Sequence, residues 1–350
     1  MILDLALPCL AHEAPSHEHA KLVPIPDYEP PSGEVGAAAS LKAAEAFLAS
    51  FDEATRAQLM HDIDATERAG WSNLPARFVT RAGVSVGEMS DGQRKLLFDF
   101  LASSLSAEGY RKVSEVIAAE AFLSDAWLAR LWSWSPENYW ISFYGTPSAT
   151  SPWGWRFGGH HLALNLSVEG NRVRTMSPSF VGTEPALFTY NGVEYEVVVD
   201  MHRAGYALYA ALDPAQKTAA DAGTVPEELL TGPGKDGVIP PAIGLSAAEM
   251  TANQKALLLA AINRWVSIQP SENARRRMAE LEADLDRTSF AWTGANDAST
   301  PTYMIIQGPA LIIELLSTGG NVGRNASGLG HYHTIYRNPT LEYGGSDPWR

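Results

Sequence analysis

Apolar residues recur at helical spacing through the first third of the chain. Between residues 38 and 65 they repeat every three to four positions, as on one face of a helix. Ser90-Asp-Gly-Gln93 then places a hydroxyl at an N-cap and Gln three positions later, which is a capping box ahead of a second apolar stripe. A third stripe runs from about Glu108 to Trp132. The pattern predicts helices in all three segments.

The periodicity changes after Pro136, where segments rich in aromatic and β-branched residues follow. Gly170-Asn171 is typical of a hairpin turn, because both residues tolerate positive φ. A short helix is expected at 212–216, where Asp213 caps and Pro214 follows at the first helical position. Longer helices are expected at 251–266 and 271–285. The predicted strands are 139–145, 160–168, 172–176, 193–200, 289–293, 301–307, 310–316 and 331–337.

The order of these elements repeats along the chain. Residues 83–97 align without gaps on residues 244–258, with Gly, Ser, Glu, Met, Gln and a Leu-Leu pair identical. After each copy come a second helix, an aromatic strand ending in Gly, and an apolar strand led by Gly. We interpret this as an internal duplication. It predicts an α+β fold with two pseudo-symmetric halves, each a helix pair followed by antiparallel strands.

The predicted organisation is an N-terminal tail over residues 1–37, a first half over 38–210 and a second half over 211–350. The halves are expected to form one compact unit, since 350 residues with 45% hydrophobic content can bury a full core.

Charge and cysteine content exclude several classes of protein. The net charge is −14, and no cluster of Lys and Arg stands out, so neither nucleic acid nor a phosphate-binding surface is expected. The single cysteine, Cys9, excludes a disulfide framework and a cysteine-rich metal site. No apolar run is long enough to span a bilayer, so no membrane partner is expected. The apolar start lacks a basic leader, which favours a cytoplasmic protein and leaves export open.

Common catalytic motifs are missing from the sequence. It has no dinucleotide-binding glycine fingerprint after a strand and no His-Glu-x-x-His. Nicotinamide enzymes and the common zinc proteases are therefore disfavoured. The Gly-rich segment 231–237 lacks the flanking strand and the terminal Lys-Ser/Thr of a P-loop.

Two pairs of histidines carry the candidate chemistry. In the last strand, His331 and His333 share a face with Arg337, because alternate side chains of a strand point the same way. The second pair, His160 and His161, opens another apolar strand. If the hairpins of the two halves face each other, one of this second pair could approach His331 and His333.

Which of the two adjacent histidines faces the site stays open. In a regular strand they point to opposite sides, so only one can join. The side of His161 also carries Asn165 and is the more polar, unless His160 lies in the preceding loop. Three neutral imidazoles and a water match an open divalent-metal site, with zinc first and iron or copper as alternatives. Histidines that only form hydrogen bonds in a core are the simpler interpretation.

Three further residues are candidates for catalysis. Glu314 interrupts an apolar strand, where a carboxylate costs several kcal/mol unless it is paired or ligated. It is a possible fourth ligand, general base or partner of Arg337. Arg337 could hold a substrate carboxylate in a bidentate fork or form a structural salt bridge. Glu184 is a weaker candidate, because loop carboxylates are usually solvated.

These residues predict a metal-dependent enzyme, more hydrolytic than redox, acting on a small anionic or polar substrate. An iron- or copper-dependent oxidoreductase would use the same imidazoles. Two further classes of protein fit the same residues, a non-catalytic metal- or ligand-binding protein and a purely structural α+β protein. No residue pattern indicates an oligomeric state.

An ordered set of short motifs resembles the bacterial family catalogued as domain of unknown function 3500. The set comprises Met89-Ser-Asp-Gly-Gln-Arg94, Glu120, Phe157-Gly-Gly-His-His-Leu-Ala-Leu-Asn165, Ser177-Pro-Ser-Phe-Val-Gly-Thr-Glu-Pro185, Phe290-Ala-Trp-Thr-Gly294 and His331-Tyr-His-Thr-Ile-Tyr-Arg-Asn-Pro339. The resemblance covers about residues 39–345. The family's terminal motif has Asp after the Arg, and Asn338 stands there in this chain, which argues against an acid–base role at that position. The resemblance supports the histidine site and implies no particular reaction, and many relatives look exported.

Overall fold

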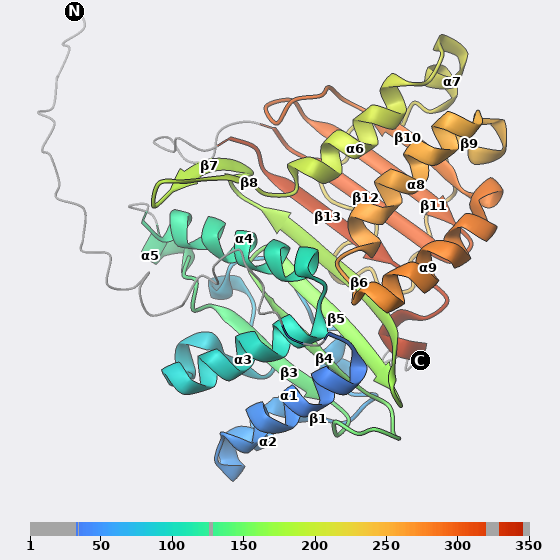
Figure 1. The fold of residues 1–350 in the computed structure, drawn as a ribbon. Coiled ribbons are helices and arrows are strands. Elements are labelled where there is room, and N and C mark those ends of the chain that lie inside the picture. The colour runs from blue at the N-terminus through green and yellow to red at the C-terminus, as the bar shows by residue number, and fades with distance from the viewer. Residues whose placement is uncertain (1–32, 34, 126–128, 320–328, 346–350) are drawn as a thin grey trace, which may run out of the picture.

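The computed structural model describes residues 33, 35–125, 129–319 and 329–345. One large, mostly antiparallel sheet runs through this part of the chain, with helices packed on one face (Figure 1). The mixed α+β class predicted from the sequence is thereby confirmed. Most of the predicted tail, including Cys9, lies outside the described residues, and the first helix begins at Ala37.

The helices of the described residues fall into two groups separated by strands. They are α1 (Ala37–Ala49), α2 (Glu53–Leu59), α3 (Asp91–Ser104), α4 (Ala107–Ser124), α5 (Ala129–Trp132), α6 (Val199–Ala210), α7 (Pro214–Ala219), α8 (Ala252–Val266) and α9 (Ser271–Ala283). None of the described helices is long and apolar enough to cross a membrane. The cellular compartment stays a prediction.

Eleven strands form the main sheet in the order β1-β3-β4-β5-β6-β13-β12-β11-β10-β9, with β2 paired to β3. All neighbours are antiparallel except β1 and β3. The strands are β1 (Met60–His61), β2 (Val84–Ser85), β3 (Tyr139–Tyr144), β4 (Trp153–Gly159), β5 (Leu162–Glu169), β6 (Arg172–Thr183), β9 (Leu245–Ser246), β10 (Ser289–Thr293), β11 (Thr302–Gly308), β12 (Leu311–Ser317) and β13 (Tyr332–Arg337). A separate hairpin pairs β7 (Leu187–Tyr190) with β8 (Val193–Glu196).

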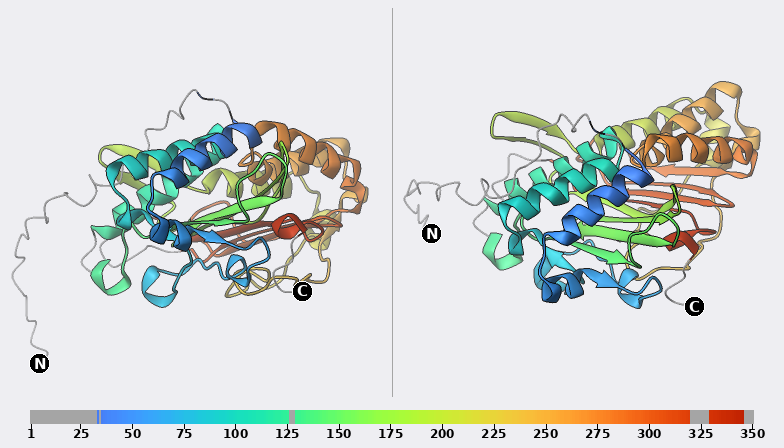
Figure 2. Two further views of the ribbon diagram at one scale, coloured as in Figure 1. Left: turned by 90° about the horizontal axis from the view of Figure 1, so that it is seen from below. Right: turned by 60° about the horizontal axis from the view of Figure 1, so that its bottom comes forward.

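The two faces of the sheet are covered differently. Helices α1, α3, α4, α6, α8 and α9 lie together on one face, and irregular segments lie on the other (Figure 2). The larger apolar cluster fills the helical side. On the second face a smaller cluster packs Trp71 and Leu229, from two of these irregular segments, near Phe180 of β6 and Ile335 of β13. Both faces of the central strands are therefore buried.

The centre of the sheet is the antiparallel pair of β6 and β13. Its register sets Thr183 opposite Tyr332 and Ser179 opposite Tyr336. Because β5 also pairs with β6, strands from distant parts of the sequence become neighbours across one ladder. The end of β6 and the start of β13 consequently lie side by side at the same end of the central strands.

The predicted capping boxes are present. Ser90 and Gln93 exchange hydrogen bonds at the start of α3, and Thr251 and Gln254 do so at the start of α8. Asp213 caps α7 in the same way. Short local signals were thus sufficient to locate these helix starts.

Elsewhere the predicted elements needed correction. Residues 197–200 were assigned to a strand because of their β-branched run, but β8 ends at Glu196 and α6 begins at Val199. The helix α6 buries Met201, Gly205 and Leu208, and this packing outweighs the strand propensity of the three valines. Strands β1, β2, β4, β7 and β9 were not predicted.

Three boundaries also differ from prediction. Strand β6 extends beyond 176 to Thr183. The helical stripe of 38–65 divides into α1 and α2, since Asp52 accepts a hydrogen bond from the Thr55 amide and starts a new helix. The stripe of 108–132 divides into α4 and α5, with 126–128 outside the described residues.

Gly83 and Gly244 occupy matching positions where the chain enters β2 and β9. Their φ angles are 97° and 91°, in a region that residues other than Gly rarely adopt. A Cβ on Gly83 would lie 2.0 Å from the Ile141 carbonyl oxygen, and one on Gly244 would lie 2.2 Å from that of Phe290. Both obstacles are strand backbone, which cannot move without breaking the ladder.

We expect Gly83→Ala and Gly244→Ala each to lower the free energy of unfolding by roughly 2–4 kcal/mol, from backbone strain and steric overlap. Chemical denaturation monitored by circular dichroism measures the loss. Gly92→Ala is the matched control, because no atom lies within 4 Å of its Cβ position and Ala favours the helix. Equal stability of all three variants would contradict the assignment of strain to these two turns.

Candidate metal centre

The four predicted histidines meet at one end of the central strands. The turn between β4 and β5 carries His160 and His161, and β13 begins just after His331. The register sets Leu162 opposite Val181 and Tyr332 opposite Thr183, so both histidine pairs lie beside the end of β6. Glu184 follows directly after β6. The predicted approach of the first histidine pair to the second is confirmed.

His160 and His161 do not belong to a strand, contrary to our expectation for residues 160–168. Strand β5 begins at Leu162, and His161 takes a left-handed conformation with φ of 59° in the turn. The two rings stack at 3.8 Å between centroids instead of pointing to opposite faces. The turn is held by two backbone hydrogen bonds, from His161 to the Asn73 carbonyl and from Gly182 to the His161 carbonyl.

Three imidazole nitrogens converge in this turn. The Nε2 atom of His331 lies 3.1 Å from that of His161 and 3.0 Å from that of His333. His161 and His333 are buried, whereas the His331 side chain is 26% exposed. The three rings form a group that could hold a metal ion, and they come from two predicted halves of the chain.

Burial favours the neutral form of two of these rings, those of His161 and His331. It lowers the pKa of His331 to about 3, with smaller contributions from His333 and His160. The pKa of His161 is held well below its usual value by burial and by the three neighbouring imidazoles. Neutral imidazole is the form that ligates metals, so the nitrogens are available without loss of a proton near neutral pH.

The protons on these rings cannot satisfy all the contacts at once. The Asn73 amide nitrogen lies 3.4 Å from His333 Nε2 and can only donate, so His333 Nε2 accepts there. The Nδ1 atom of His333 then carries the proton and faces Glu228 at 3.7 Å. A proton on His331 Nε2 would have to be shared between the Nε2 atoms of His161 and His333. A bound cation, by contrast, accepts one lone pair from each of the three Nε2 atoms.

The spacing of the nitrogens also suits a cation. Bonds of about 2.05 Å in tetrahedral geometry separate two imidazole nitrogens by roughly 3.3 Å. The observed 3.0 and 3.1 Å require only a small outward movement of the rings. The donor set therefore fits a divalent metal held by His161, His331 and His333.

A second group overlaps with the first. His160, His161 and Glu184 also present ligand atoms close enough to hold an ion. His160 Nδ1 lies 2.6 Å from the Glu120 carboxylate of α4, which fixes the ring and leaves Nε2 for another partner. Burial raises the pKa of Glu184, and its carboxylate lies 4.0 Å from His331 Nε2. Glu184 is thus largely buried and not solvated as expected for a loop residue.

Glu314 is placed in other contacts. It is fully buried and accepts hydrogen bonds from the Leu230 and Thr231 amides, each at 2.8 Å, and from the Tyr303 hydroxyl at 2.7 Å. The Thr231 hydroxyl donates to it as well. No described hydrogen bond of Glu314 reaches a histidine or Arg337, so its contacts hold the segment that follows Glu228.

Arg337 is likewise engaged within the protein. Its guanidinium is 2% exposed and lies 2.7 Å from both the Asp236 and the Glu342 carboxylates. It also donates to the carbonyls of Thr231 and Gly232. These contacts match the structural salt bridge considered as its alternative role, and the partners are Asp236 and Glu342, not Glu314.

Sequence reasoning assigned no role to the residues that orient the histidines, although Glu120 was among the family's motifs. Glu120 stands in the apolar stripe of α4 and is 3% exposed, so a buried carboxylate there was a usable signal. Asn73 and Glu228 lie in irregular segments, where no pattern of spacing marks them. Their positions follow only from the folding of these segments over the sheet.

Comparison with known proteins gives one family and no activity. No curated protein and no solved structure matches the chain significantly. A family model described as "Protein of unknown function (DUF3500)" matches residues 34–345. This range includes every residue of the candidate centre, and the chain therefore belongs to the DUF3500 family.

Proposed function

We propose that this protein is a metal-dependent enzyme that hydrolyses a small polar or anionic substrate. The observation that carries the proposal is the convergence of three imidazole nitrogens from His161, His331 and His333. Zinc suits such a set best, because three imidazoles and an open position are a common catalytic arrangement for it.

Several features favour catalysis over a structural ion. Structural zinc sites are usually closed by four protein ligands, whereas this group has three. The side chains of His331 and Glu184 are each about a quarter exposed, so water and a small substrate can reach them. A carboxylate with a raised pKa beside the imidazoles adds a group that can move protons.

The proposed roles follow from the contacts. A divalent cation, when bound, supplies Lewis-acid activation of water or of a substrate carbonyl or phosphoryl oxygen. Glu184 takes the proton from the attacking water and returns it to the leaving group. Glu120 fixes His160, whose ring stacks on His161 and holds it in place. Arg337 and Glu314 have no part in this chemistry, since their polar atoms are used elsewhere.

We also propose that the halves arose by duplication and are pseudo-symmetric. Support comes from the matching segments that lead into α3 and α8, each with a two-residue strand, a 3-10 turn and a capping box. The sheet order adds further support, because β3–β6 and β10–β13 are each four consecutive strands that meet at β6 and β13. On this proposal the metal centre lies at the junction of the halves.

The first prediction from the proposed function concerns metal content. Full-length protein purified without a His-tag is expected to carry about one divalent ion per chain, measured by inductively coupled plasma mass spectrometry. His331→Ala/His333→Ala should lose it, since one imidazole remains. The matched control is His12→Ala/His17→Ala/His19→Ala, which tests adventitious binding by histidines near the N-terminus and should keep the ion. Equal metal content in the double variant and wild type would refute the centre.

The second prediction concerns Glu184. In metal-loaded protein, Glu184→Gln should lower hydrolysis of p-nitrophenyl acetate or p-nitrophenyl phosphate by about 10²–10⁴-fold, because the proton acceptor is lost. Metal content should stay within twofold of wild type. Glu194→Gln, an exposed residue of β8, is the control. Wild type could keep its metal and still hydrolyse neither ester faster than His331→Ala/His333→Ala does. That result would favour a non-catalytic metal-binding protein.

An oxygen-activating iron site is the second candidate, favoured by the group of His160, His161 and Glu184. Two histidines and one carboxylate are the ligands of many non-haem iron enzymes.

The third prediction separates the two sites by variants measured under anaerobic conditions. With ligation by His161, His331 and His333, His333→Ala should lose the metal and His160→Ala should retain it. With ligation by His160, His161 and Glu184, His160→Ala should lose the metal and His333→Ala should retain it. Glu184→Gln should then lose the metal as well, and the ion found should be iron. His61→Ala is the control in both cases, because His61 lies on β1 outside either group.

A further inference from the structure

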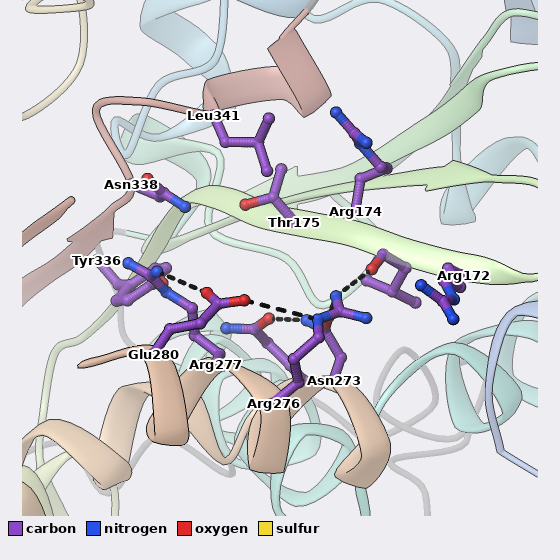
Figure 3. A pocket seen from close by; sticks show the side chains of 12 residues that line it. Arg172, Arg174, Thr175, Asn273, Arg276, Arg277, Glu280, Tyr336, Asn338 and Leu341 are labelled. Atoms are coloured by element: carbon purple, nitrogen blue, oxygen red, sulfur yellow. Dashed lines mark hydrogen bonds and ion pairs between the residues drawn. The ribbon is translucent and has the colours of Figure 1, made fainter. Parts of the chain in front are cut away.

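A second polar cavity lies at the opposite end of the central strands. It has a volume of about 280 Å³ and opens between the start of β6, the end of β13 and the helix α9 (Figure 3). Five residue steps separate His333 from Asn338 on its wall, which is about 17 Å along an extended chain. The cavity is therefore distinct from the histidine centre.

Arginines dominate the walls of this cavity. Arg172 and Arg174 come from β6, and Arg276 and Arg277 come from α9. Glu280 is the acidic residue among the lining side chains. The expectation that the chain has no cluster of Lys and Arg was wrong, because the consecutive Arg275, Arg276 and Arg277 stand in α9. Folding brings two of them beside the arginines of β6 in a chain of net charge −14.

The arginines of α9 are held in place by the protein. Arg277 donates to the Tyr336 hydroxyl at 2.9 Å and pairs with Glu280 at 3.0 Å. Arg276 donates to the Val173 carbonyl at 2.7 Å and lies 3.9 Å from Glu280. One acidic side chain thus serves two guanidinium groups, and positive charge remains in excess. Fixed donors bind an anion with little further loss of side-chain entropy.

The β6 arginines leave more of their charge uncompensated. Arg174 pairs with Glu169 at 3.1 Å, with both side chains about half exposed, where screening makes such a pair weak. Arg172 has no hydrogen-bond or ionic partner within the described part of the chain. Four positive charges therefore face two negative ones around the cavity.

Neutral donors complete the lining. Thr175 is 4% exposed and Asn338 is 5% exposed, yet both side chains reach the cavity. The Asn338 Oδ1 atom accepts from the Thr340 hydroxyl at 2.8 Å, which leaves its Nδ2 donor toward the cavity (Figure 3). Over the residues that the structure covers, neither this Nδ2 nor the Thr175 hydroxyl has a hydrogen-bond partner. Both donor atoms are open to the cavity, so a ligand that supplies acceptors can reach them there.

We propose that this cavity binds a small molecule carrying a multiply charged oxyanion, either a phosphate or clustered carboxylates. The guanidinium groups match the oxygens of both, and Thr175 and Asn338 add uncharged donors. The volume is at the lower end of the ligand pockets of proteins, which excludes a polymer from the interior. The site does not depend on the metal centre.

Titration calorimetry with inorganic phosphate, pyrophosphate and citrate tests the proposal on the full-length chain. Wild type is expected to bind at least one of these probes with 1:1 stoichiometry, and the preferred probe tells a phosphate ligand from a carboxylate ligand. Arg172→Gln and Arg276→Gln should each weaken that binding about 10-fold or more, as for loss of a charge-assisted hydrogen bond. Thr175→Val, which changes no charge, should weaken it by a smaller factor of about 3–10.

Arg275→Gln is the matched control, because this exposed neighbour on α9 carries the same charge but does not line the cavity. It should bind within twofold of wild type. The Arg172 side chain makes no described hydrogen bond or ion pair, so its variant should fold normally even if Arg276→Gln does not. The proposal would be overturned if wild type bound none of the three probes at 10 mM. It would also be overturned if the Arg275 and Arg172 variants showed equally weakened binding.

Discussion

The antiparallel pairing of β6 with β13 is the constraint on which both candidate sites depend. Its ladder joins residues about 150 positions apart in the sequence, and side chains of both strands are buried along most of their length. Because side chains alternate along a strand, a slip of one residue would turn His333 and Arg337 to the opposite face. The same slip would separate His331 from the turn that holds His161. Register therefore controls ligand geometry more directly than any single hydrogen bond does.

Charged side chains are buried on the face of the sheet that irregular segments cover. They are stabilised there because hydrogen bonds and ion pairs occupy their polar atoms. Glu314 and Arg337 reach the same short segment, the former through amide donors and the latter through the Thr231 and Gly232 carbonyls. A buried ion left without partners would cost several kcal/mol, so these contacts offset most of the desolvation. The fixed segment begins just after Glu228, which faces His333. Two residues outside the metal centre thus help to position a group that contacts it.

Local signals in the sequence were enough for much of the fold and for part of the site. The capping boxes at Ser90 and Thr251 depend on neighbours three positions away, and the shared face of His331 and His333 follows from strand periodicity. The left-handed turn at His161 could not be predicted in this way, since its backbone hydrogen bonds involve Asn73 and Gly182. The arginine cavity was missed for a similar reason, because β6 and α9 are about 100 residues apart. Tertiary contacts decide such features, and one sequence does not reveal them.

The contrast between Glu184 and Glu314 shows how the contacts of a carboxylate decide its chemical capacity. Glu314 accepts four hydrogen bonds from Leu230, Thr231 and Tyr303, so its lone pairs are occupied. Glu184 is three-quarters buried, its carboxylate lies 4.0 Å from the uncharged His331 ring, and burial raises the pKa of Glu184. A carboxylate that is desolvated but not saturated binds protons more readily, which is the property a general base near neutral pH requires. Apolar surroundings made Glu314 conspicuous in the sequence, but on the proposed function the lone pairs available beside the imidazoles suit Glu184 to proton transfer.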